Sequence, residues 1–251
     1  MPVAQSYPSL VLVWEKWCVE NHGSSPDTCE TYRRYLEKPL DPENRWSAKA
    51  YKLFYRWLCD EQGDEEACKL YKRVKVPKAG EDIAVPSLED VKRTLENAGP
   101  YRIVYWVLLQ SGIRLNEALK LLANADKAEC VEVNGFYRCK LGWKRGMKRA
   151  LWAYLLEPLP REPVRFTRKQ VYKHAKKHGL VLPKYIRKFV ATKMSELDIP
   201  DDVIDFYQGR VPERVLNKSY AQKRGKADKW YKVYAEWLRE NGFLESEDRG
   251  G

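Results

Sequence analysis

The sequence predicts a mainly α-helical protein of two domains, the second of which contains a small three-stranded antiparallel β-meander. Three observations support this. Apolar residues recur at helical spacing through most of the 251 residues, a stretch near residue 80 lacks that period, and an alternating pattern surrounds Asn134-Gly135. We predict a helical domain at 1–78, a linker at 79–86, and a larger domain at 87–251 that ends in a helical tail.

The first domain is predicted to contain three amphipathic helices. Apolar and aromatic residues recur at helical spacing around residues 11–18, 32–36 and 46–58, and a Ser-Ser-Pro-Asp sequence marks the start of the second helix. The stretch from Lys72 to Asp82 has no such period and contains proline and glycine, which is typical of a linker.

The second domain is predicted to begin with a helix after Ser87, where Asp90 completes a capping box. An apolar run at 103–109 predicts the next helix, and Ser111-Gly112 separates it from another that begins near Arg114. Strands are then predicted at 131–133, 136–141 and 150–155. Asn134-Gly135 is a type I′ hairpin signal, and Gly146 lies in the second turn. The remainder is predicted to be helical, apart from short loops.

The six cysteines form no CxxC pair, and the three histidines complete no plausible zinc set. We therefore predict no metal site and no cofactor. The chain carries no recognisable leader and no run of 18 apolar residues, so we expect a cytoplasmic protein without membrane contact. In that compartment cysteines are usually reduced, although disulfides of the kind found in thermophiles stay an alternative.

Positive charge is concentrated in one segment. Residues 138–193 contain 17 Lys/Arg against two acids, whereas residues 1–80 are almost neutral, with 13 Lys/Arg against 12 acids. Such a segment suits a phosphate backbone, although charge alone is also compatible with the solvated face of a helix. We expect double-stranded DNA as the partner, with phosphate contacts from Lys140, Arg145, Arg149, Arg168, Lys169 and Lys173.

Three short segments carry candidate chemistry. Arg114 stands at a helix start with Glu117 three residues later, an arrangement that equally suits a simple intrahelical ion pair. Lys184 and Arg187 share a helix face, where two cations repel unless an anion lies between them. The third segment, from Gln208 to Tyr220, carries Arg210 and ends in Lys-Ser-Tyr. Individually these segments are weak signals.

In order, these boxes resemble the tyrosine recombinase (phage integrase) family, and most closely the archaeal virus and plasmid integrases. "SGIRLNEALKL" is similar to the first arginine box, "KYIRKF" to the second, and "YQGRVPERVLNKSY" to the last. Lys184 and Arg210 stand where most members carry histidine, and the spacing from Arg210 to Tyr220 is one residue longer than in most bacterial members. The resemblance covers about residues 85–225 by motif.

The resemblance implies a core-binding domain, a catalytic domain and a DNA integrase that needs neither metal nor ATP. It assigns Tyr220 as the nucleophile, Arg114, Arg187 and Arg210 as phosphate ligands, Lys184 as their partner and Glu117 as a supporting acid. It also implies a dimer or tetramer on paired sites, and integration or excision of a viral or plasmid element.

The family's catalytic lysine has two candidates here. Ungapped comparison with phage integrases points to Lys144, whereas the archaeal pattern favours Lys148, which we prefer. Two other functions stay open at this stage. One is a type IB topoisomerase-like enzyme that relaxes DNA, and the other is a non-catalytic helical DNA-binding regulator.

Overall fold

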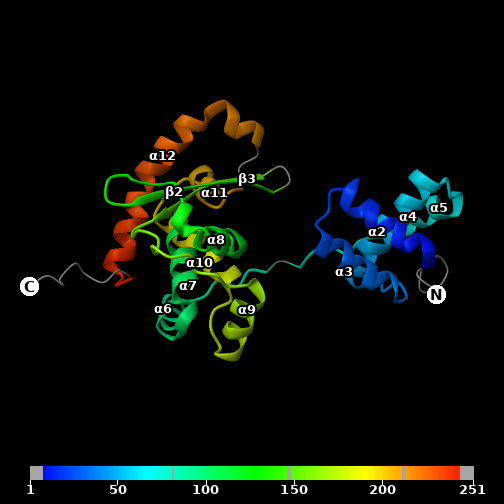
Figure 1. Cartoon of the computed structure of the whole chain (residues 1–251), viewed down its shortest axis with the longest axis horizontal. Coiled ribbons are helices and arrows are strands. Elements are labelled where there is room, and N and C mark those ends of the chain that lie inside the picture. Colours follow the sequence, from blue (N-terminus) through cyan, green and yellow to red (C-terminus); the bar gives the residue numbers. More distant parts are fainter. Residues whose placement is uncertain (1–7, 81, 146–147, 211–212, 244–251) are drawn as a thin grey trace, which may run out of the picture. The chain divides into compact units, whose positions relative to one another are not determined.

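The computed structural model describes residues 8–80, 82–145, 148–210 and 213–243, and gives the backbone alone for residues 8, 144, 145, 148, 149 and 213–221. The chain forms two compact units, Met1–Asp82 and Ile83–Gly251. The fold class is confirmed, since the described part is mainly helical and contains one three-stranded antiparallel sheet (Figure 1). Among the described residues, no helix has the length and apolar character needed to cross a membrane.

The N-terminal unit is helical throughout its described part (Figure 1). Its helices are α2 (Pro8–Glu20), α3 (Pro26–Leu36), α4 (Arg45–Gln62) and α5 (Glu65–Arg73). The Ser25 side chain caps α3 by accepting a hydrogen bond from the Thr28 amide, as the start signal predicted. Trp14, Phe54 and Trp57 are buried between the helices and form an aromatic core.

Helix α5 was not predicted from the sequence. It has nine residues, of which only Ala67 is buried, so its apolar pattern is too short to detect. The following extended segment also belongs to the helical unit. The side chains of Arg45 and Lys52 donate hydrogen bonds to the carbonyls of Pro77 and Val74, which fastens the start of the expected linker to α4.

In the C-terminal unit, helices precede and follow the sheet along the chain. Before it come α6 (Leu88–Asn97), α7 (Arg102–Ser111) and α8 (Leu115–Ala123); after it come α9 (Arg168–Lys177), α10 (Pro183–Glu196), α11 (Asp201–Tyr207) and α12 (Glu213–Glu240). The capping box of Ser87 and Asp90 opens α6, and Gly112, at a φ of 62°, ends α7. Both features agree with the sequence prediction.

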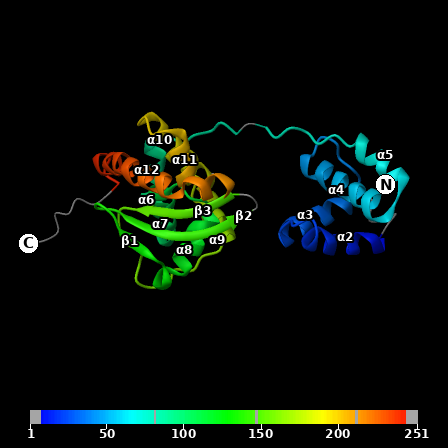
Figure 2. The same ribbon diagram turned by 90° about the horizontal axis from the view of Figure 1, so that it is seen from above.

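The sheet has the order β1-β2-β3, with β1 at Cys130–Glu132, β2 at Tyr137–Arg145 and β3 at Lys148–Leu155 (Figure 2). Asn134 and Gly135 both have positive φ, 54° and 82°, as a type I′ turn requires. An irregularity between Lys140 and Trp143 shifts the register of β2 against β3. Both long strands extend further than the sequence pattern predicted.

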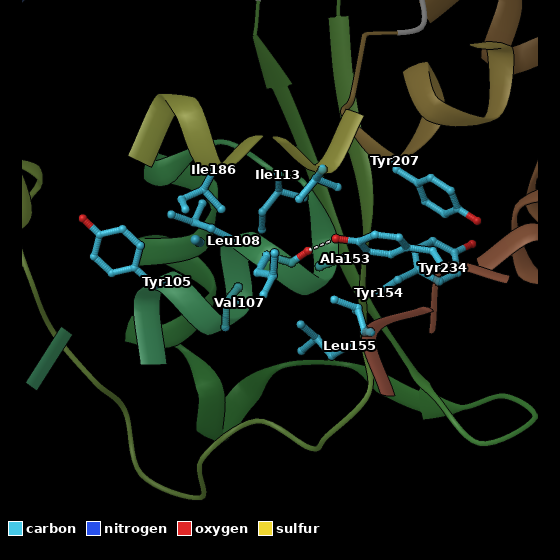
Figure 3. Packing of buried hydrophobic residues seen from close by; sticks show 14 of the residues in the cluster. Tyr105, Val107, Leu108, Ile113, Ala153, Tyr154, Leu155, Ile186, Tyr207 and Tyr234 are labelled. Carbon is cyan, nitrogen blue, oxygen red and sulfur yellow. Dashed lines mark hydrogen bonds between the residues drawn. The ribbon is translucent and has the colours of Figure 1, made fainter. Parts of the chain in front are cut away.

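Helix α12 packs on its own domain. Tyr231, Tyr234 and Leu238 are fully buried in the main core, and α7, α11 and α12 all contact β3. Figure 3 shows Tyr154, Tyr207 and Tyr234 grouped at one edge of this core, away from Tyr105. The helical tail therefore contributes to the core of its own chain.

The expectation of reduced cysteines is wrong. All six are paired, as Cys18–Cys29, Cys59–Cys68 and Cys130–Cys139. The sequence spacings of 11, 9 and 9 residues gave no indication of this. Packing of α2 on α3 and of α4 on α5, and the register of β1 against β2, bring the partners together.

Candidate active site

One cavity of about 620 Å³ collects most of the residues that the three sequence segments singled out. Its wall comes from the start of α8, the end of β2, α9, the start of α10 and the residue Arg210. We call it the arginine cavity; it is lined by Ile113, Arg114, Leu115, Asn116, Glu117, Lys120, Trp143, Arg168, Tyr172, Pro183, Lys184, Arg187, Lys188 and Arg210. Seven of these are Lys or Arg and one is acidic, so the cavity favours an anion.

Arg114 is the N-cap residue of α8 and is only 24% exposed in its side chain. Glu117 holds it at two points: one carboxylate oxygen accepts from the Arg114 amide at 2.7 Å and the other from Nη1 at 2.9 Å. The same Nη1 is 3.3 Å from the carbonyl of Gln208. The ion pair expected from the sequence is therefore present, and it also fixes the guanidinium at the cavity wall.

Arg187 lies on α10 and its guanidinium group meets the same Gln208 carbonyl. Its Nη1 donates to the carbonyl of Gly112 at 3.1 Å, and its Nη2 donates to the carbonyl of Gln208 at 2.6 Å. Burial, and then the charges of Arg114 and Arg210, lower the pKa of Arg187 to about 9. The guanidinium is thus still protonated at neutral pH, in surroundings that disfavour its charge until an anion enters.

The turn after α11 is packed tightly beneath these arginines. Gly209 has a φ of 56°, and a Cβ at this position would lie 2.9 Å from the Cα of Ala150 on β3. Gly112 is similar, because a Cβ there would lie 3.0 Å from a methyl group of Val190. Both glycines allow the chain to approach a neighbouring element closely enough for its carbonyls to meet the guanidinium groups.

Lys184 and Arg210 complete the cationic wall. Lys184, exposed near the start of α10, holds its ammonium group 4.3 Å from the centre of the Tyr185 ring. Arg210 follows the Gly209 turn and is 3.5 Å from a carboxylate oxygen of Asp205. Their side chains are more exposed than those of Arg114 and Arg187. They can therefore adjust their position to a bound ligand more easily than those two arginines can.

The residue predicted to be the nucleophile and the two candidate hairpin lysines lie only partly within the described structure. Tyr220 is part of helix α12, and Lys144 and Lys148 occupy the last position but one of β2 and the first of β3. The side chains of all three fall outside the described residues. The backbone register pairs Lys144 with Arg149 and Arg145 with Lys148.

The expected DNA contacts divide into three groups. Arg168 opens α9 and lines the arginine cavity, while Lys169 and Lys173 are exposed on the same helix. Lys140 is 2.7 Å from Glu129 in an ion pair. The side chains of Arg145 and Arg149 lie outside the described residues.

The roles of three further residues at the site were not predicted from the sequence. Lys120 and Trp143 line the cavity together, with the Lys120 ammonium 4.5 Å from the centre of the indole ring. Gln208 contributes its carbonyl to both Arg114 and Arg187. A glutamine before glycine is no recognised signal, and any residue offers a carbonyl, so sequence patterns could not have revealed this role. Among the described residues, no group of three or more metal-ligating side chains comes together.

Comparison with known proteins supports the resemblance noted in the sequence. One solved structure, described as XerA recombinase, is 15% identical and aligns with 86% of this chain and 99% of its own, at a TM-score of 0.32. A search of curated protein sequences finds no match. Residues 83–237, which contain all the boxes, match the family described as archaeal phage integrase. This match spans more than half of the chain, which therefore belongs to the archaeal phage integrase family.

Proposed function

We propose that this integrase cuts and rejoins DNA strands through a 3′-phosphotyrosyl bond to Tyr220, and so integrates or excises a viral or plasmid element. The observation that carries the proposal is the arginine cavity. Three arginines from separate parts of the chain, together with Lys184, line one space that contains a single acid. A plain DNA-binding protein has no need to concentrate partly buried guanidinium groups around one cavity.

The scissile phosphodiester would enter the cavity with its non-bridging oxygens toward Arg114, Arg187 and Arg210. As the Tyr220 oxygen bonds to phosphorus and the bond to the 5′ oxygen breaks, negative charge grows on those oxygens. Donors already held in place stabilise this charge without reorganisation, and the loss of one such donor costs about 10²–10³-fold in rate. The burial and fixed hydrogen bonds of Arg114 and Arg187 support this role.

The departing 5′ oxygen needs a proton, which a lysine of the hairpin would supply. The backbone register supports Lys148. Positions 143, 145, 148 and 150 share one face of the β2–β3 ladder, whereas 144 and 149 belong to the other. Trp143 lines the cavity, so position 148 is on the cavity face of the ladder.

Lys184 would hydrogen-bond the same phosphate or assist the transfer of a proton from Tyr220. The covalent bond to tyrosine conserves the energy of the broken phosphodiester, so the second strand can be joined without ATP. Reversal of the same steps, with a new 5′ hydroxyl as the attacking group, restores the duplex.

The surrounding surface would hold the duplex. Arg168, Lys169 and Lys173 on α9 extend the positive charge of the cavity, and Lys140, Arg145 and Arg149 add charge from β2 and β3. By likeness to the family, the N-terminal unit would act as a core-binding domain that clamps the duplex. Two or four copies would then assemble on paired recombination sites. Because phosphate contacts dominate, we expect affinity to fall steeply with salt.

The test is covalent trapping on a duplex with a nick close to the scissile bond, so that the released fragment is lost and religation fails. Wild-type protein should give a protein–DNA adduct on a denaturing gel, also in the presence of EDTA, and Tyr220→Phe should give none. Cleavage by the Tyr220→Phe variant would refute the mechanism. Loss of wild-type cleavage on addition of EDTA would refute it as well. Recombination of paired sites, rather than relaxation of supercoils alone, would separate an integrase from a topoisomerase-like enzyme.

A further inference from the structure

Gln208 is the residue on which two partly buried arginines of the proposed site, Arg114 and Arg187, converge. Its side chain is completely buried, although it is polar. It lies in the turn between α11 and Arg210, next to the tightly packed Gly209. The proposed function gives this residue no chemical step, since neither its amide nor its carbonyl needs to touch the phosphate.

One carbonyl serves both guanidinium groups. The backbone oxygen of Gln208 accepts from Nη2 of Arg187 at 2.6 Å and from Nη1 of Arg114 at 3.3 Å. These arginines come from α10 and from the start of α8, so the shared acceptor sets the distance between two side chains that no covalent segment joins closely. A carbonyl dipole between two like charges also reduces their mutual repulsion.

The Gln208 side chain holds Arg187 a second time. Its Nε2 donates to the backbone oxygen of Arg187 at 2.9 Å. Arg187 is therefore bound at both ends by a single residue, its backbone by the amide and its guanidinium by the carbonyl. This fixes both the position of that turn of α10 and the direction of the arginine side chain.

The arrangement carries a cost for stability. The other amide atom, Oε1, is buried and has no hydrogen-bond partner among the residues that the structure describes. A buried acceptor without a donor destabilises a fold, and an apolar side chain of the same length would remove that cost. If the residue at this position only filled space, methionine or leucine would make the fold more stable than glutamine does.

We infer that Gln208 is a positioning residue for DNA cleavage: its amide holds Arg187, and thereby the pair Arg114–Arg187, in the geometry that receives the scissile phosphate. The inference rests on the proposed function and adds a residue to it. Because small displacements of preorganised donors are costly, removal of the amide should slow the chemical step about 10- to 100-fold. DNA affinity should not change, since it depends on many other phosphate contacts.

The experiment compares three full-length variants in single-turnover cleavage of the nicked duplex. Gln208→Met removes the amide at nearly constant length, and Gln208→Leu removes it with a shorter, branched side chain. Gln110→Met is the matched control, because Gln110 is also a buried glutamine, but its Oε1 accepts from the Leu156 amide at 2.6 Å and, among the described residues, its side chain has no hydrogen bond to an arginine. For each variant we would measure the cleavage rate constant, the fraction of the protein that forms the adduct (the reacting fraction), the Kd for DNA and the Tm.

Both Gln208 variants should show the lowered rate constant with an unchanged reacting fraction and Kd, and Gln208→Met should keep or raise the Tm. Gln110→Met should lower the Tm and leave the rate constant within about twofold. A duplex with a neutral methylphosphonate at the scissile position depends less on guanidinium charge, so there the deficit of the Gln208 variants should shrink. A purely structural role predicts instead a smaller reacting fraction and the same deficit on both substrates.

Wild-type cleavage rates in both Gln208 variants would overturn the inference and leave the proposed function intact, as would a loss confined to the reacting fraction. If only one of the two variants folds, the comparison is decided on that one. Failure of the wild-type protein to form any adduct would instead overturn the proposed function and this inference together.

Discussion

Arg138 on β2 and Asp228 on α12 form an ion pair that is largely shielded from solvent, with 12% and 18% of their side chains exposed. Tyr154 donates to the second carboxylate oxygen at 2.8 Å, and the guanidinium group of Arg138 lies 5.0 Å from the centre of the Trp152 ring. Burial and the nearby Asp228 raise the pKa of Tyr154 well above its usual value. The pair thus joins the hairpin strand to the helix that carries Tyr220.

Asp228→Asn should lower the free energy of unfolding by about 3 kcal/mol, because it leaves the buried Arg138 without its counter-ion while keeping an oxygen for Tyr154. Urea denaturation measures this loss. The double variant with Arg138→Met should recover most of it, since neither charge is then buried. A loss in the double variant equal to the sum of the losses in Asp228→Asn and Arg138→Met alone would show that the two residues are not coupled.

Gly209→Ala should destabilise the protein and abolish cleavage. The positive φ and the 2.9 Å approach to Ala150 force the turn to move, and with it the carbonyls that hold Arg114 and Arg187. Gly225→Ala is the matched control. Gly225 lies within α12 with no atom near its missing Cβ, so this change should stabilise the helix by roughly 0.5–1 kcal/mol without loss of activity. Thermal denaturation and covalent trapping test both variants.

Glu117→Gln should slow cleavage about 10- to 100-fold, because hydrogen bonds to charged groups contribute roughly 1.5–3 kcal/mol and Arg114 would lose its charged partner. DNA binding should stay equal or strengthen, since an acid leaves the arginine cavity. Single-turnover rates and a binding titration separate these opposite effects. Glu129→Gln breaks the exposed pair with Lys140 and should change neither quantity measurably.

The lowered pKa of Arg187 predicts a pH dependence of stability. Between about pH 9 and the ordinary arginine value, the unfolded chain binds more protons at this site than the native protein, so the site's contribution to stability rises with pH. Relative to Arg187→Met, the wild-type protein should gain about 1.4 kcal/mol between pH 8 and 10. Denaturation curves of both proteins give the difference, and sulfate should flatten it by occupying the cavity. A difference that falls with pH would contradict the assignment.

Reduction of the disulfides should lower thermal stability. Each closes a short loop of 9 to 11 residues, for which the loss of one disulfide costs roughly 2–3 kcal/mol. The Tm should fall when dithiothreitol is added to the wild-type protein. A variant with Cys59→Ala and Cys68→Ala should start from a lower Tm and respond less to the reductant. An unchanged wild-type Tm would show that these bonds do not contribute.

Local signals explain which parts of the fold were predictable. Ser25, Ser87, Gly112 and Asn134-Gly135 each act through the chain beside them, and the structure has the expected cap or turn at every one. Helix α5 has no comparable apolar stripe and depends on α4, which the sequence pattern alone does not reveal. The disulfides depend in the same way on how elements pack.

In the site, too, some features follow from the sequence and others only from the packing of elements that are distant in the sequence. The order of Arg114, Lys184, Arg187 and Arg210 in the sequence predicted side chains that the structure places in one cavity. The Glu117 partner of Arg114 was predictable from the sequence, but the carbonyls of Gly112 and Gln208 that orient Arg187 were not, because a carbonyl is common to every residue. The identity of Gln208 acquires meaning only when α10 lies against the turn.

The buried end of α12 has a consequence for local unfolding of the C-terminal unit. The hydroxyls of Tyr231 and Tyr234 donate to the carbonyls of Gln110 and Leu109, in the last turn of α7, just before Gly112 and Arg114. Local unfolding of α12 would release that turn as well, so we expect α12, which carries the proposed nucleophile, and the turn before Arg114 to unfold as one cooperative segment. Amide protons of α12 and of the last turn of α7 should therefore exchange at the same rate. A chain in which α12 is unfolded would lose the position of Arg114, and with it phosphate binding, at the same time as that of Tyr220.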